Sequence, residues 1–319
     1  MSLDDAAFDI VGGTVVHYRG EEEIIGIPSR HDLVAQYGGN STVIDEAIAA
    51  GNPVAFMPTV AEDKQVWHKT HMTYTLRMFG TLIDGSKACV IIKDINVFFD
   101  VRTADVERIH TLLKVAGVKG YTLNVIRARA IRPYGDEQPF VRVATQSLTE
   151  RKKGIHACRD SGLETASDDL TCYFRKVARE YQLPLCDWLM LREYESVRKN
   201  LCKYVFSISI ADIAAWDVAA GPGAVRTPEM IRDRTLVVTH DIETISGRGT
   251  GDVPMPEHDL DKCFMICLTA HWRTSTNSLV QICIVDIETE PDPRWITVIV
   301  DSPINVLRAY ALCVGLLAP

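Results

Sequence analysis

Strict alternation of apolar and polar side chains predicts β-strands early in the chain. Residues 72–78 alternate at every position, which is the period of a half-buried strand. Asp84 and Gly85 form a typical hairpin turn, and a second strand is expected over residues 88–92, leading through Val97–Phe99. The first 50 residues show no strong period, and we treat them as an N-terminal extension.

Two helices are predicted where apolar residues recur every three or four positions. Thr103 can cap the first helix, which has acidic residues in its first turn and stops at Gly117. The second helix is expected after the cap at residues 167–169, with its apolar stripe facing the core. The opposite stripe consists of Arg175, Lys176 and Arg179.

The Gly- and Pro-rich run 219–228 is the clearest linker, so we place a domain boundary near residue 230. Beyond it, a helix is expected from Ser302 and Pro303 to Leu317. Four strands precede this helix, over residues 236–242, 263–271, 279–286 and 295–300. The pattern therefore predicts an α+β protein, with a mixed α/β domain over 51–230 and a β-meander followed by a helix over 231–319.

Composition and charge change this picture little. The chain has 319 residues, of which 47% are hydrophobic and 24% charged, with a formal net charge of −8. These values are ordinary for a globular protein. The negative net charge argues against a wholly basic nucleic-acid coat but is compatible with local basic patches. The sequence shows no signal peptide and no apolar run long enough to span a membrane. We therefore expect a soluble intracellular protein without a membrane partner.

The nine cysteines indicate reduced thiols in place of a disulfide framework. Their number is odd, and no two of them form a Cys-x-x-Cys pair. Structural zinc sites usually present four ligands in paired spacings, so a zinc site is not predicted.

Residues 235–246 combine an apolar strand with two carboxylates, Asp241 and Glu243, which are separated by Ile242. Because side chains alternate faces along a strand, both carboxylates are expected to project together, with Ile242 turned into the core. Such a pair can contribute to a two-metal site, in which cations about 3.5–4 Å apart activate water and stabilise the leaving oxygen of a phosphodiester. It could also act as the acid and base of a glycoside hydrolase.

The letters Asp-Ile-Glu-Thr occur twice, so the motif alone identifies no site. The second copy, residues 286–289, follows a predicted strand and runs into a Pro-rich turn, which places its carboxylates at a strand end in solvent. The first copy is expected to end the opening strand of its domain, before the long loop 247–262. That arrangement leaves a strand end open to substrate. The absence of an aromatic sugar platform nearby argues against a carbohydrate hydrolase.

Basic and aromatic residues are interleaved after the first predicted helix. The basic segment contains Arg127, Arg129, Arg132 and Arg142, with Tyr134 and Phe140 between them. Such interleaving can follow a nucleic-acid backbone, although a solvated charged surface is the commoner explanation. The four arginines are our candidate nucleic-acid-binding residues.

Several ordered motifs resemble family B DNA polymerases, and most closely the large viral members of the African swine fever virus type. Residues 238–246, followed by Cys263–Cys267, look like the Exo I motif and second strand of the 3′–5′ exonuclease domain. Further segments are similar to the N-terminal domain of those enzymes. They are residues 56–58, 73–80, 97–101, 168–175 and 183–188. The resemblance covers roughly residues 51–319.

The resemblance implies a division into an extension over 1–50, a polymerase N-terminal domain over 51–230 and a partial ribonuclease H-like exonuclease domain over 231–319. The last residues resemble the segment just ahead of the Exo II motif, so we expect Exo II, Exo III and the polymerase domains to be missing. Residues 96–100 spell a similar motif in the wrong domain, and Asp100 is not carried over. We expect this fragment alone to have little or no exonuclease activity.

By the same resemblance, Asp241 and Glu243 are the first two catalytic and metal-binding carboxylates of the exonuclease, with Mg²⁺ or Mn²⁺ as cofactor. The implied partners are a DNA template-primer, a single-stranded 3′ end, the remainder of the polymerase chain and a processivity factor. The implied location is a viral replication site in the host cell. The alternative function is a non-catalytic nucleic-acid-binding or assembly module that uses the basic segment.

Overall fold

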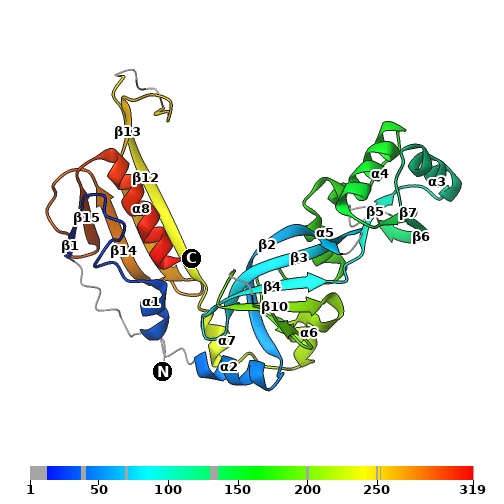
Figure 1. Cartoon of the computed structure of the whole chain (residues 1–319), viewed down its shortest axis with the longest axis horizontal. Coiled ribbons are helices and arrows are strands. Elements are labelled where there is room, and N and C mark those ends of the chain that lie inside the picture. The colour runs from blue at the N-terminus through cyan, green and yellow to red at the C-terminus, as the bar shows by residue number, and fades with distance from the viewer. Residues whose placement is uncertain are drawn as a thin grey trace. The chain divides into compact units, whose positions relative to one another are not determined.

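The chain forms two compact units. Unit 1 consists of residues Met1–Asn40 and Thr227–Pro319, and unit 2 of residues Ser41–Arg226. The computed structural model, drawn in Figure 1, describes residues 13–36, 41–68, 71–129, 136–198, 201–248, 251 and 253–318. The first 50 residues, which we expected to form a separate extension, are divided between the two units. The expected boundary at residue 230 lies inside helix α7 (Pro228–Arg232), just past the unit boundary.

Unit 2 is built on a seven-stranded sheet with the order β11-β8-β2-β3-β4-β10-β9. Its strands are β2 (Val54–His68), β3 (His71–Leu82), β4 (Lys87–Lys93), β8 (Leu189–Leu191), β9 (Glu195–Ser196), β10 (Tyr204–Ser209) and β11 (Ile213–Ala215). The alternating stretch 72–78 lies within β3, and Gly85 turns the chain into β4 with a φ of 82°. The predicted hairpin is therefore confirmed.

A three-stranded sheet with the order β5-β7-β6 forms the second sheet of unit 2. It contains β5 (Val97–Val101), β6 (Thr122–Arg129) and β7 (Glu137–Thr145), so Val97–Phe99 starts a new sheet instead of continuing β4. Helices α3 (Val106–Val115) and α4 (Leu148–Asp160) pack on it around a core that includes Phe99 and Leu113. The cap of α3 is Asp105, whose carboxylate accepts from the Arg108 amide, and not the expected Thr103.

Short helices complete unit 2. They are α2 (Ser41–Ala49), the 3₁₀ turns η1 (Ser167–Leu170) and η2 (Ile210–Asp212), α5 (Tyr173–Glu180) and α6 (Trp216–Ala220). The helix predicted after residues 167–169 is therefore interrupted and resumes at Tyr173. Lys176, expected on the stripe opposite the core, is fully buried.

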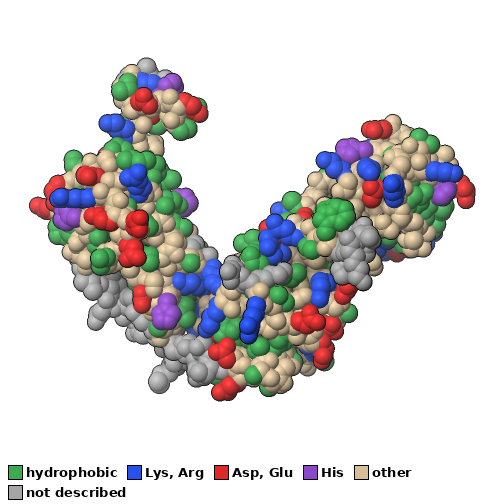
Figure 2. All heavy atoms as spheres, viewed as in Figure 1, with side chains coloured by type: hydrophobic (Ala, Val, Ile, Leu, Met, Phe, Trp, Pro, Cys, Tyr) green, Lys and Arg blue, Asp and Glu red, His purple; other side chains and the backbone are tan. Residues whose placement is uncertain are grey.

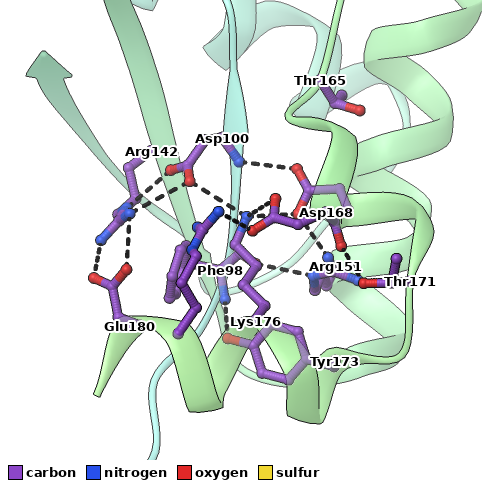
Figure 3. A network of polar contacts seen from close by, with 12 residues as sticks. Phe98, Asp100, Arg142, Arg151, Thr165, Asp168, Thr171, Tyr173, Lys176 and Glu180 are labelled. Carbon is purple, nitrogen blue, oxygen red and sulfur yellow. Dashed lines mark hydrogen bonds and ion pairs between the residues drawn. The ribbon is translucent and has the colours of Figure 1, made fainter. Parts of the chain in front are cut away.

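A buried ionic cluster explains the position of Lys176 (Figure 3). Its ammonium lies 2.7 Å from Asp169 Oδ1 and 3.3 Å from oxygens of Asp168 and Asp100. Arg151 of α4 lies 2.7 Å from the same Asp169 oxygen and also donates to the Phe98 carbonyl. A buried ammonium needs such carboxylates, because an uncompensated charge in the interior is strongly unfavourable.

The ionic cluster joins the three-stranded sheet to α5, and Asp63 joins α5 to the seven-stranded sheet. Asp63 of β2 accepts hydrogen bonds from the Tyr173 amide at 3.0 Å and from the Tyr74 hydroxyl at 2.6 Å. The Tyr173 hydroxyl in turn accepts from the Phe98 amide and donates to the Asn96 carbonyl. The segment 168–176 therefore connects both sheets of unit 2.

Unit 1 contains a five-stranded sheet with the order β1-β15-β14-β13-β12. Its strands are β1 (Val15–Tyr18), β12 (Leu236–Ser246), β13 (Asp261–Trp272), β14 (Ser278–Val285) and β15 (Ile296–Val300). Strands β12, β13 and β14 form an antiparallel meander, as predicted. Strand β15 departs from it, because it pairs parallel with β14 and takes β1 from the N-terminal segment as a parallel neighbour.

Helix α8 (Pro303–Leu317) lies across one face of this sheet and contacts β13, β14 and β15 (Figure 1). Its buried residues include Val306 and Cys313, and α1 (Arg30–Gln36) adds Leu33 to the same core. Strand β12 is the edge strand and projects with β13 beyond the covered area. Ile242 was expected in the core, but it is 45% exposed. No element in the described part of the chain covers that section of β12. No helix among the described residues is long and apolar enough to cross a membrane.

We expect Lys176→Met to destabilise unit 2 by about 3–5 kcal/mol, because it leaves buried carboxylates without their cation. Urea unfolding followed by circular dichroism measures this loss. Arg175→Met, on the exposed side of the same helix, is the matched control and should change stability by less than about 0.5 kcal/mol. Equal midpoints for the two variants would contradict a structural role for the Lys176 charge.

Candidate functional site

Strand β12 carries both predicted carboxylates on one face. Asp241 pairs in register with Cys267 and Glu243 with Met265, and the only irregularity of this ladder follows Glu243. The two side chains therefore project together, as expected. Both lie within the strand, which continues to Ser246, and not at its end as the sequence suggested.

The carboxylates occupy the sheet face opposite α8. Their neighbour His240 points to the other side, where its ring lies 5.7 Å from the ring of Tyr310 on α8. Across the sheet from Asp241, Cys267 and then Cys283 follow in register on the carboxylate face. Burial raises the pKa of Cys283 to about 12, and the adjacent Cys267 thiol contributes to the rise.

Asp241 and Glu243 are both exposed, and their oxygens are available to a ligand. Within the described part of the chain, neither carboxylate has a hydrogen bond or an ion pair. Exposed carboxylate oxygens suit Mg²⁺, which is commonly held by one or two carboxylates together with water and substrate phosphates. The donor set therefore fits a divalent ion. It is also incomplete, because the described residues contain no group of three or more His, Cys, Asp or Glu placed around a metal.

The second Asp-Ile-Glu-Thr segment, residues 286–289, differs from the first in its structure. It lies directly after β14, outside any strand. Glu288 is exposed and lies 3.7 Å from His17, and Ile287 is 65% exposed. The expected place at a strand end is confirmed, and Glu288 faces solvent as expected, whereas Asp286 is half-buried.

The end of the β12–β13 hairpin is closed by a cluster around Asp261. Arg248 Nη2 lies 2.8 Å from Asp261 Oδ2, and the Ser246 hydroxyl lies 2.6 Å from Oδ1. The hydrogen bond from Ser246, with those from the Met255 amide and Arg248, lowers the pKa of Asp261 to about 2. Acidic, basic and apolar side chains gather at the hairpin tip in Figure 2, where Val253 and Leu260 are exposed.

The described arginines of the predicted basic segment lie on two faces of the three-stranded sheet. Arg127 and Arg129 lie on the same face of β6 and are exposed, and Arg127 lies 3.9 Å from Glu137. In register, Arg127 is opposite Pro139, whereas Arg142 is opposite Asn124, so Arg142 lies on the other face of the sheet. Arg132 lies outside the described residues.

Arg142 is occupied by the ionic cluster. Its guanidinium lies 2.8 Å from Asp100, pairs with Glu180 and stacks 3.9 Å from the centre of the Phe98 ring. Burial alone would lower the pKa of Arg142, but the hydrogen bonds to Asp100 and Glu180 raise it above its usual value. A pocket of about 380 Å³ opens beside these groups. Because two carboxylates compensate the Arg142 charge, this arrangement does not favour a phosphate, and the nucleic-acid contact expected at Arg142 stays a prediction.

The structure also brings together residues that the sequence analysis did not connect. Asp169, Arg151 and Lys176 come from three different helical segments, and Cys267 and Cys283 from adjacent strands. The doublet Asp168-Asp169 ahead of a basic helix was the available signal for the ionic cluster. For the thiols, the signal was the central position of each cysteine in a predicted strand.

An α+β chain with an exposed acid pair on the edge strand of a mixed sheet defines a candidate divalent-metal site. No family model matches this chain. It is 32% identical over 267 residues to the DNA polymerase beta of African swine fever virus, isolate Pig/Kenya/KEN-50/1950, a match that covers 81% of this chain and 21% of that protein. The DNA polymerase beta of strain Badajoz 1971 Vero-adapted is 31% identical over 297 residues, or 90% of this chain and 23% of that protein.

This chain thus spans about a fifth of the length of the curated relatives that it matches. Among solved structures, it is similar to the family B DNA polymerase from the hyperthermophilic archaeon Pyrobaculum calidifontis. That match has a TM-score of 0.48 and 18% sequence identity, and it covers 75% of this chain and 28% of the archaeal chain.

We expect acidification to release the hairpin cluster. The pKa of Asp261 is about 2 in the folded chain, below its value of about 3.9 in the unfolded chain. The ionised carboxylate therefore contributes fully to the stability of the fold above about pH 3.9, and this contribution is lost as pH falls through about 2. Asp261→Asn should increase amide hydrogen exchange at Met255 and Arg248 at neutral pH. Asp259→Asn, at an exposed position of the same loop, should leave the protection unchanged. Unaltered exchange in Asp261→Asn would show that the cluster does not hold the loop.

Proposed function

We propose that this chain is the N-terminal segment of a viral family B DNA polymerase with 3′–5′ exonuclease activity. The support is its similarity to the African swine fever virus DNA polymerases beta over 81–90% of its length. Residues 51–230 would form the polymerase N-terminal domain, and residues 231–319 the opening part of the exonuclease domain. The parent enzyme would extend DNA on a template and remove mismatched 3′ ends.

The observation that carries the exonuclease assignment is the pair Asp241 and Glu243, exposed on one face of an edge strand and without a protein partner among the described residues. These two residues would hold Mg²⁺ or Mn²⁺. A divalent ion bound there supplies Lewis-acid activation of water and stabilises the oxygen that leaves the phosphodiester. Asp241 and Glu243 would hold the ion on the exposed face of β12, which a single-stranded 3′ end would approach.

Hydrolysis needs more carboxylates than these two. In a two-metal site, one cation stabilises the attacking oxygen and the other the leaving oxygen of the phosphodiester. The described residues contain no group of three or more His, Cys, Asp or Glu that could hold these cations. Strand β12 ends the sheet with its outer edge unpaired in the described structure, so it can accept a further strand. We propose that another segment of the parent polymerase supplies the remaining ligands, and that this chain alone has little or no exonuclease activity.

The proposed function also defines partners and location. The parent enzyme would bind a DNA template-primer, the remainder of the polymerase chain and a processivity factor. It would act at a viral replication site in the host cell.

We expect this chain to bind Mn²⁺ weakly at the acid pair. Titration of the isotopically labelled protein should broaden the NMR signals of residues 241–243 and of Met265 and Cys267 across the ladder. The double variant Asp241→Asn and Glu243→Gln should lose this broadening, because it removes the anionic oxygens and keeps the shape of the side chains. Asp286→Asn with Glu288→Gln changes the second copy of the motif and should retain it.

Broadening that persists in the Asp241 and Glu243 variant would exclude these residues as ligands. The same proteins separate binding from hydrolysis in an assay with single-stranded DNA. Trimming that depends on both Mg²⁺ and Asp241 would contradict the proposal that the chain holds only part of the site.

A non-catalytic nucleic-acid-binding module is the second candidate, favoured by one observation. Arg127 and Arg129 are exposed on one face of the edge strand β6, where a phosphate backbone could contact both. The pairing of Arg127 with Glu137 weakens this case, because it compensates one of the charges.

If this candidate is correct, Arg127→Gln with Arg129→Gln will reduce the affinity for single-stranded DNA and lower the salt dependence by about one to two released counterions. Fluorescence anisotropy at several salt concentrations measures both quantities. Asp241→Ala is the control and should leave this binding unchanged. Equal affinities for the arginine variant and the original protein would remove the second candidate.

A further inference from the structure

Cys267 and Cys283 form a directly opposed pair in the middle of the unit 1 sheet. They are register partners on the antiparallel strands β13 and β14, so their side chains project from the same face. Both thiols are partly exposed, and the Cys267 thiol is near enough to raise the pKa of Cys283. A low-molecular-weight reagent can therefore reach them.

The backbone hydrogen bonds identify which kind of antiparallel pair this is. The Asp286 amide donates to the Phe264 carbonyl at 3.1 Å, so positions 264 and 286 form a hydrogen-bonded pair. Bonded and non-bonded pairs alternate along an antiparallel ladder. Three residues further on, Cys267 and Cys283 therefore form a non-bonded pair.

The other ladder of β13 gives the same result. The Arg273 amide donates to the Thr235 carbonyl at 2.9 Å, and six residues along this ladder Cys267 faces Asp241 in a bonded pair. The Cys267 backbone groups consequently point toward β12 and away from β14.

Non-bonded pairs bring opposed side chains closest together, with Cα atoms about 4.5 Å apart. A disulfide accepts Cα separations of about 4.4–6.8 Å and Cβ separations of about 3.5–4.5 Å. The two cysteines thus meet the distance requirement without a change in strand register. In contrast, Cys263 faces Thr244 of β12 in the register and has no cysteine opposite it.

We propose that Cys267 and Cys283 are a redox modification site, which a low-molecular-weight disulfide such as glutathione disulfide converts into a cross-strand disulfide next to Asp241. The Cys267 thiolate attacks one sulfur of the oxidant, breaks its S–S bond and releases one thiolate. The Cys283 thiol then loses its proton and attacks the Cys267 sulfur, releasing the second thiolate. The cysteines lose two electrons and two protons, and the oxidant becomes two thiols.

The cross-link lies one strand away from the acid pair. Asp241 is the register partner of Cys267, and all three side chains share one face of the sheet. Oxidation therefore fixes β13 to β14 directly beside the strand that carries Asp241 and Glu243. Peptide mapping reports the cross-link and needs no added metal, so this proposal can be tested separately from metal binding by the carboxylates.

Peptide mapping of the folded chain after treatment with glutathione disulfide at about pH 8 tests the proposal. Trypsin places Cys267 in residues 263–273 and Cys283 in residues 274–294. We expect these two peptides to be joined in most molecules, with the loss of two hydrogens and complete reversal by dithiothreitol. The exposed Cys172 should not be cross-linked to either peptide.

Cys267→Ser and Cys283→Ser should each abolish the cross-link, whereas Cys263→Ser, in the same tryptic peptide as Cys267, should preserve it. The circular dichroism spectrum of each variant verifies that it is folded. A cross-link that persists in Cys267→Ser, one that requires Cys263, or glutathione adducts without a cross-link would overturn the proposal.

Discussion

The burial of the Lys176 ammonium is the constraint on which the architecture of unit 2 depends. A buried cation must be met by carboxylates, and here they come from β5 and η1, while Arg151 of α4 shares one of them. Four cations and four carboxylates are involved in the ionic cluster: Arg142, Arg151, Lys176 and Arg179 with Asp100, Asp168, Asp169 and Glu180. Removing one charged member leaves its partners without compensation, so the positions of α4, α5 and the three-stranded sheet depend on one another. Asp63 extends this coupling to the seven-stranded sheet.

Local periodicity was sufficient to predict β3, β4, the four strands β12 to β15 and the final helix α8, because their side-chain patterns reflect burial on one face. It could not predict partners that are distant in the chain. β1 pairs with β15 across almost the whole sequence, and β15 lies parallel to β14 instead of continuing the meander. Lys176 was placed on the wrong side of its helix, because the pattern treats every lysine as solvated and contains no information about the carboxylates of other segments.

The sequence was sufficient to predict the carboxylate pair of the candidate site, but not how the surrounding elements cover it. The i, i+2 spacing is enough to place Asp241 and Glu243 on one face, since strand geometry requires it. The exposure of Ile242 was not predictable, because it depends on where α8 ends its cover of the sheet: Leu236 at the start of β12 is buried, whereas Ile242 further along the strand is exposed. The sequence also could not show that Arg127 and Arg142 lie on opposite faces of one sheet, because that depends on a strand register that the sequence does not reveal.

The uncovered edge of β12 gives its carboxylates a second physical role. Edge strands with exposed apolar residues such as Ile242 and Ile245 tend to pair with copies of themselves, which leads to aggregation. If two β12 strands paired antiparallel about Ile242, Asp241 of each copy would face Glu243 of the other. Like charges directly opposite each other destabilise a cross-strand pair. The acid pair therefore disfavours this pairing of β12 with a second copy of itself.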